Sequence, residues 1–396
     1  MKAVIAIDSF KGCLSSSEAN DAVERGILRA FPDAETVKIP VADGGEGTAD
    51  ALVGALGGVF KEAEVHGPLG EPIKARYGIV TVEGKKCAVI ESAAAIGLPL
   101  VPEDRRNPMK TSSFGLGELI LSALRGGCRR LLVGLGGSST VDGGVGMLSA
   151  LGYRFFDREG VLLSPCSGES MTLVASIDSS LADPLLREAE FILACDVNTV
   201  FSDAPSVFGP QKGATPPMVE ALTEGMLSLS SIIKRKTGID ISRIPGGGAA
   251  GGLGAAFSAF LNADLKRGID LVLDTLGFDS SLAGADVVIT GEGRIDLQTS
   301  LGKAPSGILR RVETVYGGTF IPIIAFCGSF AGGSSPFTRI IPVSPPEMPL
   351  SEAMDPKIAS ENLSEAAYKY FVDSRDIFLK NKYICKGNDR NNREAN

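Results

Sequence analysis

The sequence contains no tryptophan and a single histidine, His66, among its 396 residues, and aromatic residues make up only 6% of it. This shortage of aromatic side chains disfavours a protein built on base-stacking platforms. One histidine cannot supply a metal site with several histidine ligands, and nothing around His66 resembles a catalytic triad, so we interpret it as a turn residue. A net charge of −8 argues against nucleic acid or an anionic membrane as a partner. Any proton transfer must therefore depend on aspartate or glutamate.

Signals for export, for disulfides and for the commonest nucleotide motif are also missing. The seven cysteines are scattered and form no C-x-x-C pair, which is typical of small buried side chains in a reducing compartment. The apolar run within residues 1–8 is too short for a signal peptide or a membrane span, so we expect a cytoplasmic protein. Neither Gly84-Lys85 nor Gly302-Lys303 has a glycine five positions before its own glycine, which excludes a P-loop kinase.

Glycine, by contrast, is abundant: the chain has 49, clustered where apolar runs give way to helical patterns. An apolar run at 2–7 leads into Asp8-Ser9-Phe10-Lys11-Gly12, and a helix then starts with capping-box spacing at Ser15 and Glu18. The same order of strand, glycine-rich loop and helix recurs, with strands expected at 36–41, 131–135, 286–289, 321–325 and 339–343. This alternation predicts an α/β fold with a parallel sheet, whose carboxyl-end loops face one cleft.

Two stretches, 59–102 and 153–276, differ from this pattern. Short strands are expected there at 75–82, 87–90, 174–177 and 190–194. We therefore predict a Rossmann-like parallel-sheet domain formed by residues 1–58, 103–152 and 277–372. A second, inserted α/β domain is formed by residues 59–102 and 153–276, with the cleft between the two domains. A periodic helix is expected over 355–372, and the polar tail 373–396 is expected to be disordered.

Residues suited to chemistry gather in the loops that follow the expected strands. Phosphoryl transfer needs positive charge over the phosphates and a carboxylate that accepts the hydroxyl proton, and these loops hold both. The candidates for catalysis or binding are Asp8, Ser9, Lys11, Asp43, Glu46, Ser138, Thr140, Asp142, Asp196, Lys212, Gly248, Gly291, Glu292, Arg294, Asp296 and Lys303. Asp43 or Asp142 could also hold Mg²⁺. Thr140 and Asp142 suit helix N-capping equally well, and the opposite charges within 292–296 could pair with one another instead of binding a ligand.

The glycine tract 246–254 contains a G-x-G-x-x-G match at 246–251, but no acidic residue stands about 20 positions further on in a βαβ context. NAD binding is therefore disfavoured. Two interpretations of the tract around Gly248 stay open: a turn that cradles a phosphate before the helix expected at 253–261, and close packing alone.

Taken together, these segments resemble successive motifs of the bacterial glycerate kinase family. The resemblance rests on Asp8–Gly12, Ala42–Thr48, Gly134–Gly144, Phe208–Thr215, Gly246–Ala256 and Thr290–Pro305, and it runs in order from residue 1 to about residue 370. It implies phosphorylation of D-glycerate by Mg²⁺ and ATP, on a Rossmann-like domain with an inserted α/β domain. It implies further that Lys11 and Arg294 are the cations at the transferred phosphate. We assign the catalytic base to Asp196, with Asp296 as the second choice.

Two departures from the family's pattern leave alternatives open. Valine stands at 141 where the family commonly has asparagine, and the segment from Asp196 to Phe208 is about three residues shorter than in the family. The resemblance favours 2-phosphoglycerate as the product, with 3-phosphoglycerate still open. A phosphotransferase acting on another small hydroxy or sugar acid, or a degenerate ligand-binding homologue, would also fit these residues. A homodimer is left open.

Overall fold

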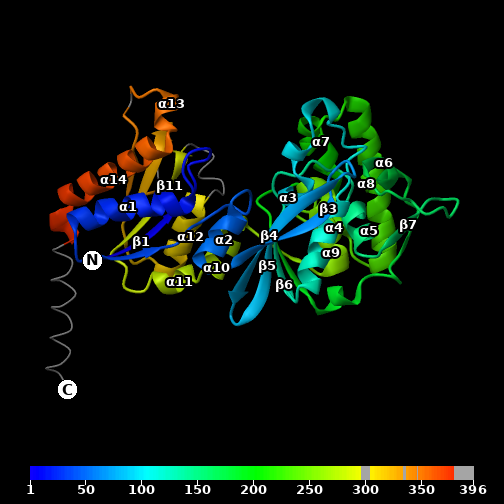
Figure 1. Cartoon of the computed structure of the whole chain (residues 1–396), viewed down its shortest axis with the longest axis horizontal. Helices are drawn as coiled ribbons and strands as arrows, with labels where there is room; N and C mark the ends of the chain where they lie inside the picture. Colours follow the sequence, from blue (N-terminus) through cyan, green and yellow to red (C-terminus); the bar gives the residue numbers. More distant parts are fainter. Residues whose placement is uncertain (296–303, 333–335, 346, 379–396) are drawn as a thin grey trace, which may run out of the picture. The chain divides into compact units, whose positions relative to one another are not determined.

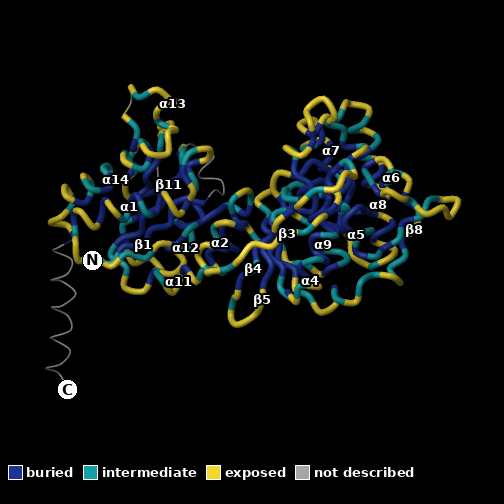
Figure 2. Tube along the Cα trace, in the orientation of Figure 1, coloured by how far each residue is buried: buried dark blue, intermediate teal, exposed yellow. Residues whose placement is uncertain are grey.

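The computed structural model describes residues 1–295, 304–332, 336–345 and 347–378. The chain divides into two compact units, one formed by Met1–Ala42 together with Val272–Asn396 and the other by Asp43–Leu271. The second unit is therefore an insertion in the sequence of the first. In each unit the central strands are largely buried, and exposed residues concentrate in loops, on outer helix faces and on edge strands (Figures 1 and 2).

The first unit is built on a sheet of five parallel strands in the order β13-β12-β11-β1-β2. Its strands are β1 (Lys2–Ile7), β2 (Glu35–Lys38), β11 (Val287–Ile295), β12 (Ile323–Phe330) and β13 (Arg339–Pro342). Its helices are α1 (Ser16–Ala30), α11 (Phe278–Ser281), α12 (Ala304–Tyr316), α13 (Leu350–Ala353) and α14 (Pro356–Asp373). The apolar run of β1 is buried because β1 is flanked by β11 and β2 within the sheet.

Helix α1 begins as its sequence predicts. The Ser15 side chain accepts a hydrogen bond from the Glu18 N–H, and the Glu18 carboxylate accepts one from the Ser15 N–H at 2.8 Å, which completes a capping box. Its buried face packs on α14 (Figure 1). At Gly26 any side chain would overlap the Ser364 carbonyl, so glycine is what allows the two helices to come so close.

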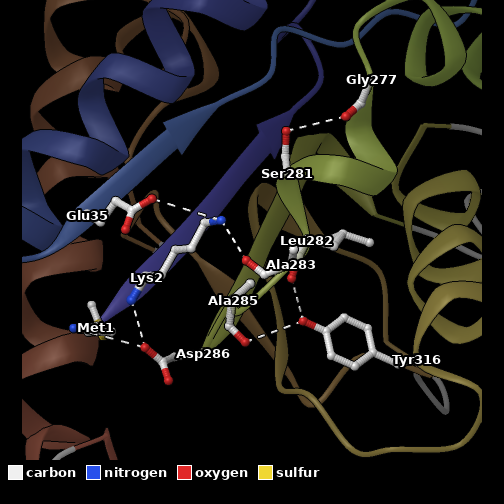
Figure 3. Close-up of polar contacts among 10 residues, drawn as sticks. All are labelled: Met1, Lys2, Glu35, Gly277, Ser281, Leu282, Ala283, Ala285, Asp286 and Tyr316. Carbon is white, nitrogen blue, oxygen red and sulfur yellow. Dashed lines mark hydrogen bonds and ion pairs between the residues drawn. The ribbon is translucent and has the colours of Figure 1, made fainter.

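The amino ends of the strands in this unit are held by a polar cluster (Figure 3). The Lys2 N–H donates to Asp286 at 2.7 Å, and the Lys2 ammonium donates to the Ala283 carbonyl at 2.7 Å. The Tyr316 hydroxyl donates to the Leu282 carbonyl at 2.7 Å. These bonds satisfy backbone groups at the amino ends of the strands, opposite the carboxyl ends where the candidate residues lie. We therefore interpret the cluster as structural.

The second unit is built on a six-stranded mixed sheet in the order β10-β9-β6-β5-β4-β3. Strands β5, β6, β9 and β10 are parallel, whereas β3, β4 and β5 form an antiparallel meander. The strands are β3 (Val59–His66), β4 (Pro72–Val82), β5 (Lys85–Glu91), β6 (Arg130–Gly134), β9 (Glu190–Ala194) and β10 (Asp264–Lys266), and β7 (Arg154–Phe156) pairs with β8 (Ser176–Asp178) in a separate ribbon.

The helices of this unit enclose one large apolar core against the sheet. They are α2 (Thr48–Ala55), α3 (Ala93–Ile96), α4 (Phe114–Arg125), α5 (Val145–Ala150), α6 (Gly168–Leu173), α7 (Ala204–Phe208), α8 (Pro216–Thr237) and α9 (Ala249–Leu261), and α10 (Gly268–Thr275) crosses the boundary between the units. Across the described ranges, no helix combines the length and the apolar character that a membrane crossing requires.

The division into units differs from the predicted boundaries. Residues 43–58 and 103–152, predicted to belong to the first domain, lie in the second unit, because β6 pairs with β5 and β9 rather than with β1. The loops that hold the candidate residues therefore follow strands of two different sheets, whereas the sequence predicted that they follow strands of a single sheet. The predicted tail also begins too early: Phe378 is buried and packs on the rings of Phe31 and Phe371, and residues 379–396 lie outside the described residues.

Candidate active site

The second unit contains a pocket of about 400 Å³ at the carboxyl ends of its parallel strands. Its walls come from the loops after β6 and β9, from the residues before α2, and from the starts of α9 and of the turn after α7. Among the predicted site residues, it brings together Asp43, Ser138, Asp196 and Lys212. Leu98, Cys195, Phe208 and Gln211 also line it. Phe208 and Gln211 belong to the motif Phe208–Thr215 but were not singled out as site residues, and no pattern in the sequence pointed to Leu98 or Cys195.

Glycines allow the loops of this pocket to meet. Gly44 has a φ of +80°, and a side chain there would lie 2.6 Å from the Ala194 Cβ and 2.8 Å from the Gly268 Cα. A side chain at Gly268 would overlap the Asp43 carbonyl, and one at Gly134 would overlap the Gly44 carbonyl. Only residues without a Cβ permit this packing. The result is that the Asp43 loop rests on the ends of β6 and β9, beside Asp196.

Asp196 lies two residues after the end of β9 and is exposed to solvent at the pocket. One of its carboxylate oxygens, Oδ1, accepts a hydrogen bond from the Gly268 N–H at 3.0 Å. Partial desolvation by the surrounding wall raises its pKa to about 6, the Gly268 hydrogen bond opposes that rise, and the negative charge of Asp43 adds to it. Asp196 is therefore ionised at neutral pH and basic enough to accept a proton from a hydroxyl group.

Lys212 ends a short 3₁₀ helix, Pro210–Lys212, and is only 3% exposed. Its ammonium donates to the Ser138 hydroxyl at 3.0 Å and to the Thr140 carbonyl at 2.8 Å. Burial lowers its pKa to about 7, while the negative charge of Asp142 acts in the opposite direction. The pocket thus contains a buried cation, and the sequence pointed to it through its position between two turn glycines.

Asp142 is completely buried and has a structural role. Its carboxylate accepts hydrogen bonds from the Ser113 N–H and hydroxyl, both at 2.7 Å, and from the N–H groups of Gly144 at 3.0 Å and Gly146 at 3.3 Å. Desolvation raises its pKa and these four donors oppose the rise. Protein donors at Ser113 and at the start of α5 thus bind this carboxylate, which favours the capping interpretation of Asp142 over the magnesium one.

Thr140 and Gly248 also lie behind the pocket wall rather than on it. Thr140 is fully buried and contributes its carbonyl to Lys212. Gly248 donates its N–H to the Thr199 carbonyl at 2.9 Å, and a side chain there would overlap the Val200 carbonyl, which favours the packing interpretation. Its neighbour Ala250 does line the pocket, in a left-handed turn with φ of +50°.

A further carboxylate that the sequence analysis missed supports the pocket. Glu91 ends β5, and its Oε1 accepts a hydrogen bond from the Ala49 N–H at 2.8 Å. Gly47 precedes α2 and has no side chain to cap it, so Glu91 supplies that acceptor from another strand. Desolvation raises the pKa of Glu91. Glu46, a predicted site residue on the same loop, is exposed and does not line the pocket.

The remaining predicted residues lie on the first unit, at the carboxyl ends of β1 and β11. The Asp8 N–H donates to the Gly291 carbonyl at 2.9 Å, and the Ser9 N–H donates to the Asp8 carboxylate at 2.7 Å. Glu292 is buried, whereas Lys11 and Arg294 are exposed on these neighbouring strand ends. The structure therefore brings both cations to one edge of the sheet. Asp296 and Lys303 lie outside the described residues.

The two carboxylates that line the pocket, Asp43 and Asp196, fit a magnesium ion. Mg²⁺ usually takes one or two carboxylates and completes its shell with water and substrate phosphates. Asp43 and Asp196 both line the pocket, and Asp43 lies close enough for its negative charge to raise the pKa of Asp196. Within the described ranges, no three aspartate, glutamate, cysteine or histidine side chains gather into a preformed metal site.

A parallel-sheet α/β fold with carboxylates and cations on its strand-end loops is typical of enzymes that act on small phosphorylated or anionic molecules. The sequence model of the glycerate kinase family matches residues 3–372 of this chain. A glycerate kinase of Bacillus cereus is 45% identical over 375 residues, which cover 93% of this chain and 96% of that protein. A glycerate 2-kinase of Escherichia coli is 45% identical over 332 residues, covering 83% of this chain and 85% of that protein.

A solved structure agrees with the sequence relatives. The crystal structure of a Salmonella typhimurium LT2 protein, provisionally named glycerate kinase 2, superposes with a TM-score of 0.84 at 41% identity and covers 98% of this chain and 99% of that one. The chain therefore belongs to the glycerate kinase family, and it is an enzyme of the kinase class. The family and the fold class expected from the sequence are both confirmed.

Proposed function

We propose that this enzyme transfers the γ-phosphoryl group of ATP to the 2-hydroxyl of D-glycerate, giving 2-phosphoglycerate and ADP. The observation that carries the proposal is the pocket of the second unit, which holds a carboxylate of raised pKa and a buried lysine in one space of about 400 Å³. The relatives from B. cereus and E. coli, named glycerate kinase and glycerate 2-kinase, support the substrate and the position phosphorylated.

Asp196 acts as the general base in this proposal. The hydroxyl O–H bond breaks as its proton passes to the Asp196 carboxylate, and the freed oxygen forms a bond to the γ-phosphorus. The bond from that phosphorus to the bridging oxygen breaks, and ADP leaves with the electron pair. The Gly268 N–H holds Oδ1 of Asp196, which fixes the carboxylate while Oδ2 takes the proton.

The strand-end loops of the first unit are proposed to bind the nucleotide phosphates. Lys11 and Arg294 would neutralise the charge on the transferred group, and the backbone around Ser9 and Gly291 would supply N–H donors. Asp8 and Glu292 would orient these loops, and Lys303 would add a further cation. Asp296 is the second choice for the base.

Magnesium is proposed to bind at Asp43 with the phosphates as its other ligands, where it would neutralise charge on the γ-phosphoryl group. Asp43 suits this role because it lines the pocket and carboxylates are preferred ligands of Mg²⁺. Since ATP is the donor, we also propose a cytoplasmic location. The homodimer remains a proposal that gel filtration would test.

ADP release measured with D-glycerate, L-glycerate, glycolate and other sugar acids as acceptors tests this function. The proposal requires turnover of D-glycerate at a kcat/KM well above that of the other acids. Preference for another acid would show a phosphotransferase of different specificity. Binding of D-glycerate and ATP without ADP release would show a ligand-binding homologue instead, and either result would overturn the proposal.

A further inference from the structure

Lys212 is a buried cation whose polar contacts are incomplete. It is 3% exposed, and two of its three N–H groups donate to neutral acceptors, the Ser138 hydroxyl and the Thr140 carbonyl. In the part of the chain that the structure describes, no carboxylate forms an ion pair with it. The negative charge of Asp142 acts on Lys212, but the Asp142 carboxylate accepts its hydrogen bonds from Ser113 and from N–H groups at the start of α5. A buried ammonium without a counterion is costly, so a ligand that supplies the counterion would remove a large penalty.

Ser138 adds a second donor directed at the same space. Its oxygen accepts from Lys212, so its own O–H must point elsewhere. No acceptor for that proton exists among the described residues, although the side chain is 6% exposed and lines the pocket. The third N–H of Lys212 and the O–H of Ser138 are therefore both available to one ligand group.

The single charge of Lys212 matches a carboxylate better than a nucleotide phosphate. Among the described residues, Lys212 is the one lysine or arginine that lines this pocket. One ammonium can balance a monoanion, whereas a polyphosphate carries several negative charges and needs further cations, such as the magnesium ion proposed at Asp43. A carboxylate has two oxygens, which matches two donors on adjacent side chains.

On the basis of the proposed function, we propose that Lys212 and Ser138 bind the carboxylate of the hydroxy acid and thereby select acids over neutral polyols and amides. The reacting hydroxyl is placed at Asp196, which also lines the pocket, so the two ends of the acid are recognised by groups of opposite charge. Lys212 is a specificity-determining residue in this account, and Ser138 completes the pair.

Steady-state kinetics with D-glycerate and with its neutral amide, D-glyceramide, test the proposal in the wild type, Lys212→Met and Ser138→Ala. We expect Lys212→Met to raise KM for D-glycerate by about 10- to 100-fold, as for loss of a hydrogen bond to a charged group. KM for D-glyceramide and for ATP should change little, so that the preference for the acid disappears. Ser138→Ala should shift the same preference by a smaller factor. Lys236→Met is the matched control, because Lys236 is exposed on α8 outside the pocket.

Two other kinetic outcomes would overturn the proposal. An equal loss of kcat/KM with the acid and with the amide would show that Lys212 only supports the structure of the surrounding loop. A rise in KM for ATP would assign the lysine to a phosphate. If the wild type does not turn over D-glycerate, the proposed function fails. Calorimetric titration of D-glycerate then still tests the carboxylate site, because the proposal requires that D-glycerate binds to the wild type and that Lys212→Met weakens this binding. If Lys212→Met does not fold, Ser138→Ala carries the same comparison.

Discussion

Replacement of Asp196 by asparagine tests the assignment of the base. Asparagine has nearly the same shape, and its carbonyl oxygen can still accept the Gly268 N–H that Asp196 now accepts at 3.0 Å. The substitution therefore removes the proton acceptor and its charge with little change to the pocket. A positioned general base contributes roughly 10²- to 10⁴-fold. We expect kcat with D-glycerate to fall by that factor, while KM for ATP stays near its wild-type value.

The pH dependence provides an independent check on the same residue. Because the pKa of Asp196 is about 6, the wild-type kcat/KM should fall as the pH drops through 6, since protonated Asp196 cannot accept the hydroxyl proton. Burial of Lys212 brings its pKa to about 7, and carboxylate binding needs its charged form, so kcat/KM should also fall as the pH rises through 7. In Asp196→Asn the acidic limb should be absent from the residual activity.

Stability separates a loss of chemistry from a loss of fold. The folded-state pKa of Asp196 is raised above its ordinary value, so the contribution of this group to stability is present at low pH and is lost as the pH rises through about 6. Asp196→Asn should therefore unfold at the wild-type temperature or higher at pH 8, and the gain should vanish near pH 4. A kcat within twofold of wild type in a folded variant would refute the assignment of the base to Asp196.

Four further substitutions test the structural and catalytic roles proposed for other residues. Asp142→Ala leaves three buried N–H groups without their acceptor. Each unsatisfied group costs about 1–3 kcal/mol, so we expect the free energy of unfolding, measured in urea, to fall by at least about 3 kcal/mol. An unchanged urea midpoint would contradict the structural role of Asp142. Gly268→Ala should lower kcat/KM by at least about tenfold by displacing the Asp43 carbonyl, whereas Gly54→Ala, in open space, should not. Lys11→Ala and Arg294→Ala should each lower kcat with unchanged unfolding temperatures, because both residues are exposed; a wild-type rate in either would remove that residue from the site.

The strands and loops that follow a local pattern could be read from the sequence. The capping box at Ser15 forms as predicted, and β9 has the predicted bounds because its apolar run is buried on both faces. By contrast, β3 was not predicted, because as an edge strand its residues are nearly all exposed and show no apolar alternation. The sheet that β6 joins could not be predicted either, since buried parallel strands look alike wherever they pair.

The candidate site shows the same limit. Its loops were found from glycine and polar residues after apolar runs, and Asp43, Asp196 and Lys212 do line one pocket. Sequence could not separate Asp142 from them, because a ligand carboxylate and a helix cap have the same residue type and position. Glu91 was missed because its partner, the Ala49 N–H, is 42 positions away in the chain and is brought near only by the fold.

Phosphorus NMR of a reaction containing the enzyme, ATP, Mg²⁺ and D-glycerate would show whether the 2-hydroxyl is phosphorylated. We expect the γ-phosphate signal of ATP to be lost while one new phosphomonoester signal appears, with its phosphorus coupled to the single proton on C2. A signal coupled to the two protons on C3 would show 3-phosphoglycerate and contradict the assignment. Inorganic phosphate alone, with no phosphomonoester, would contradict the kinase reaction itself.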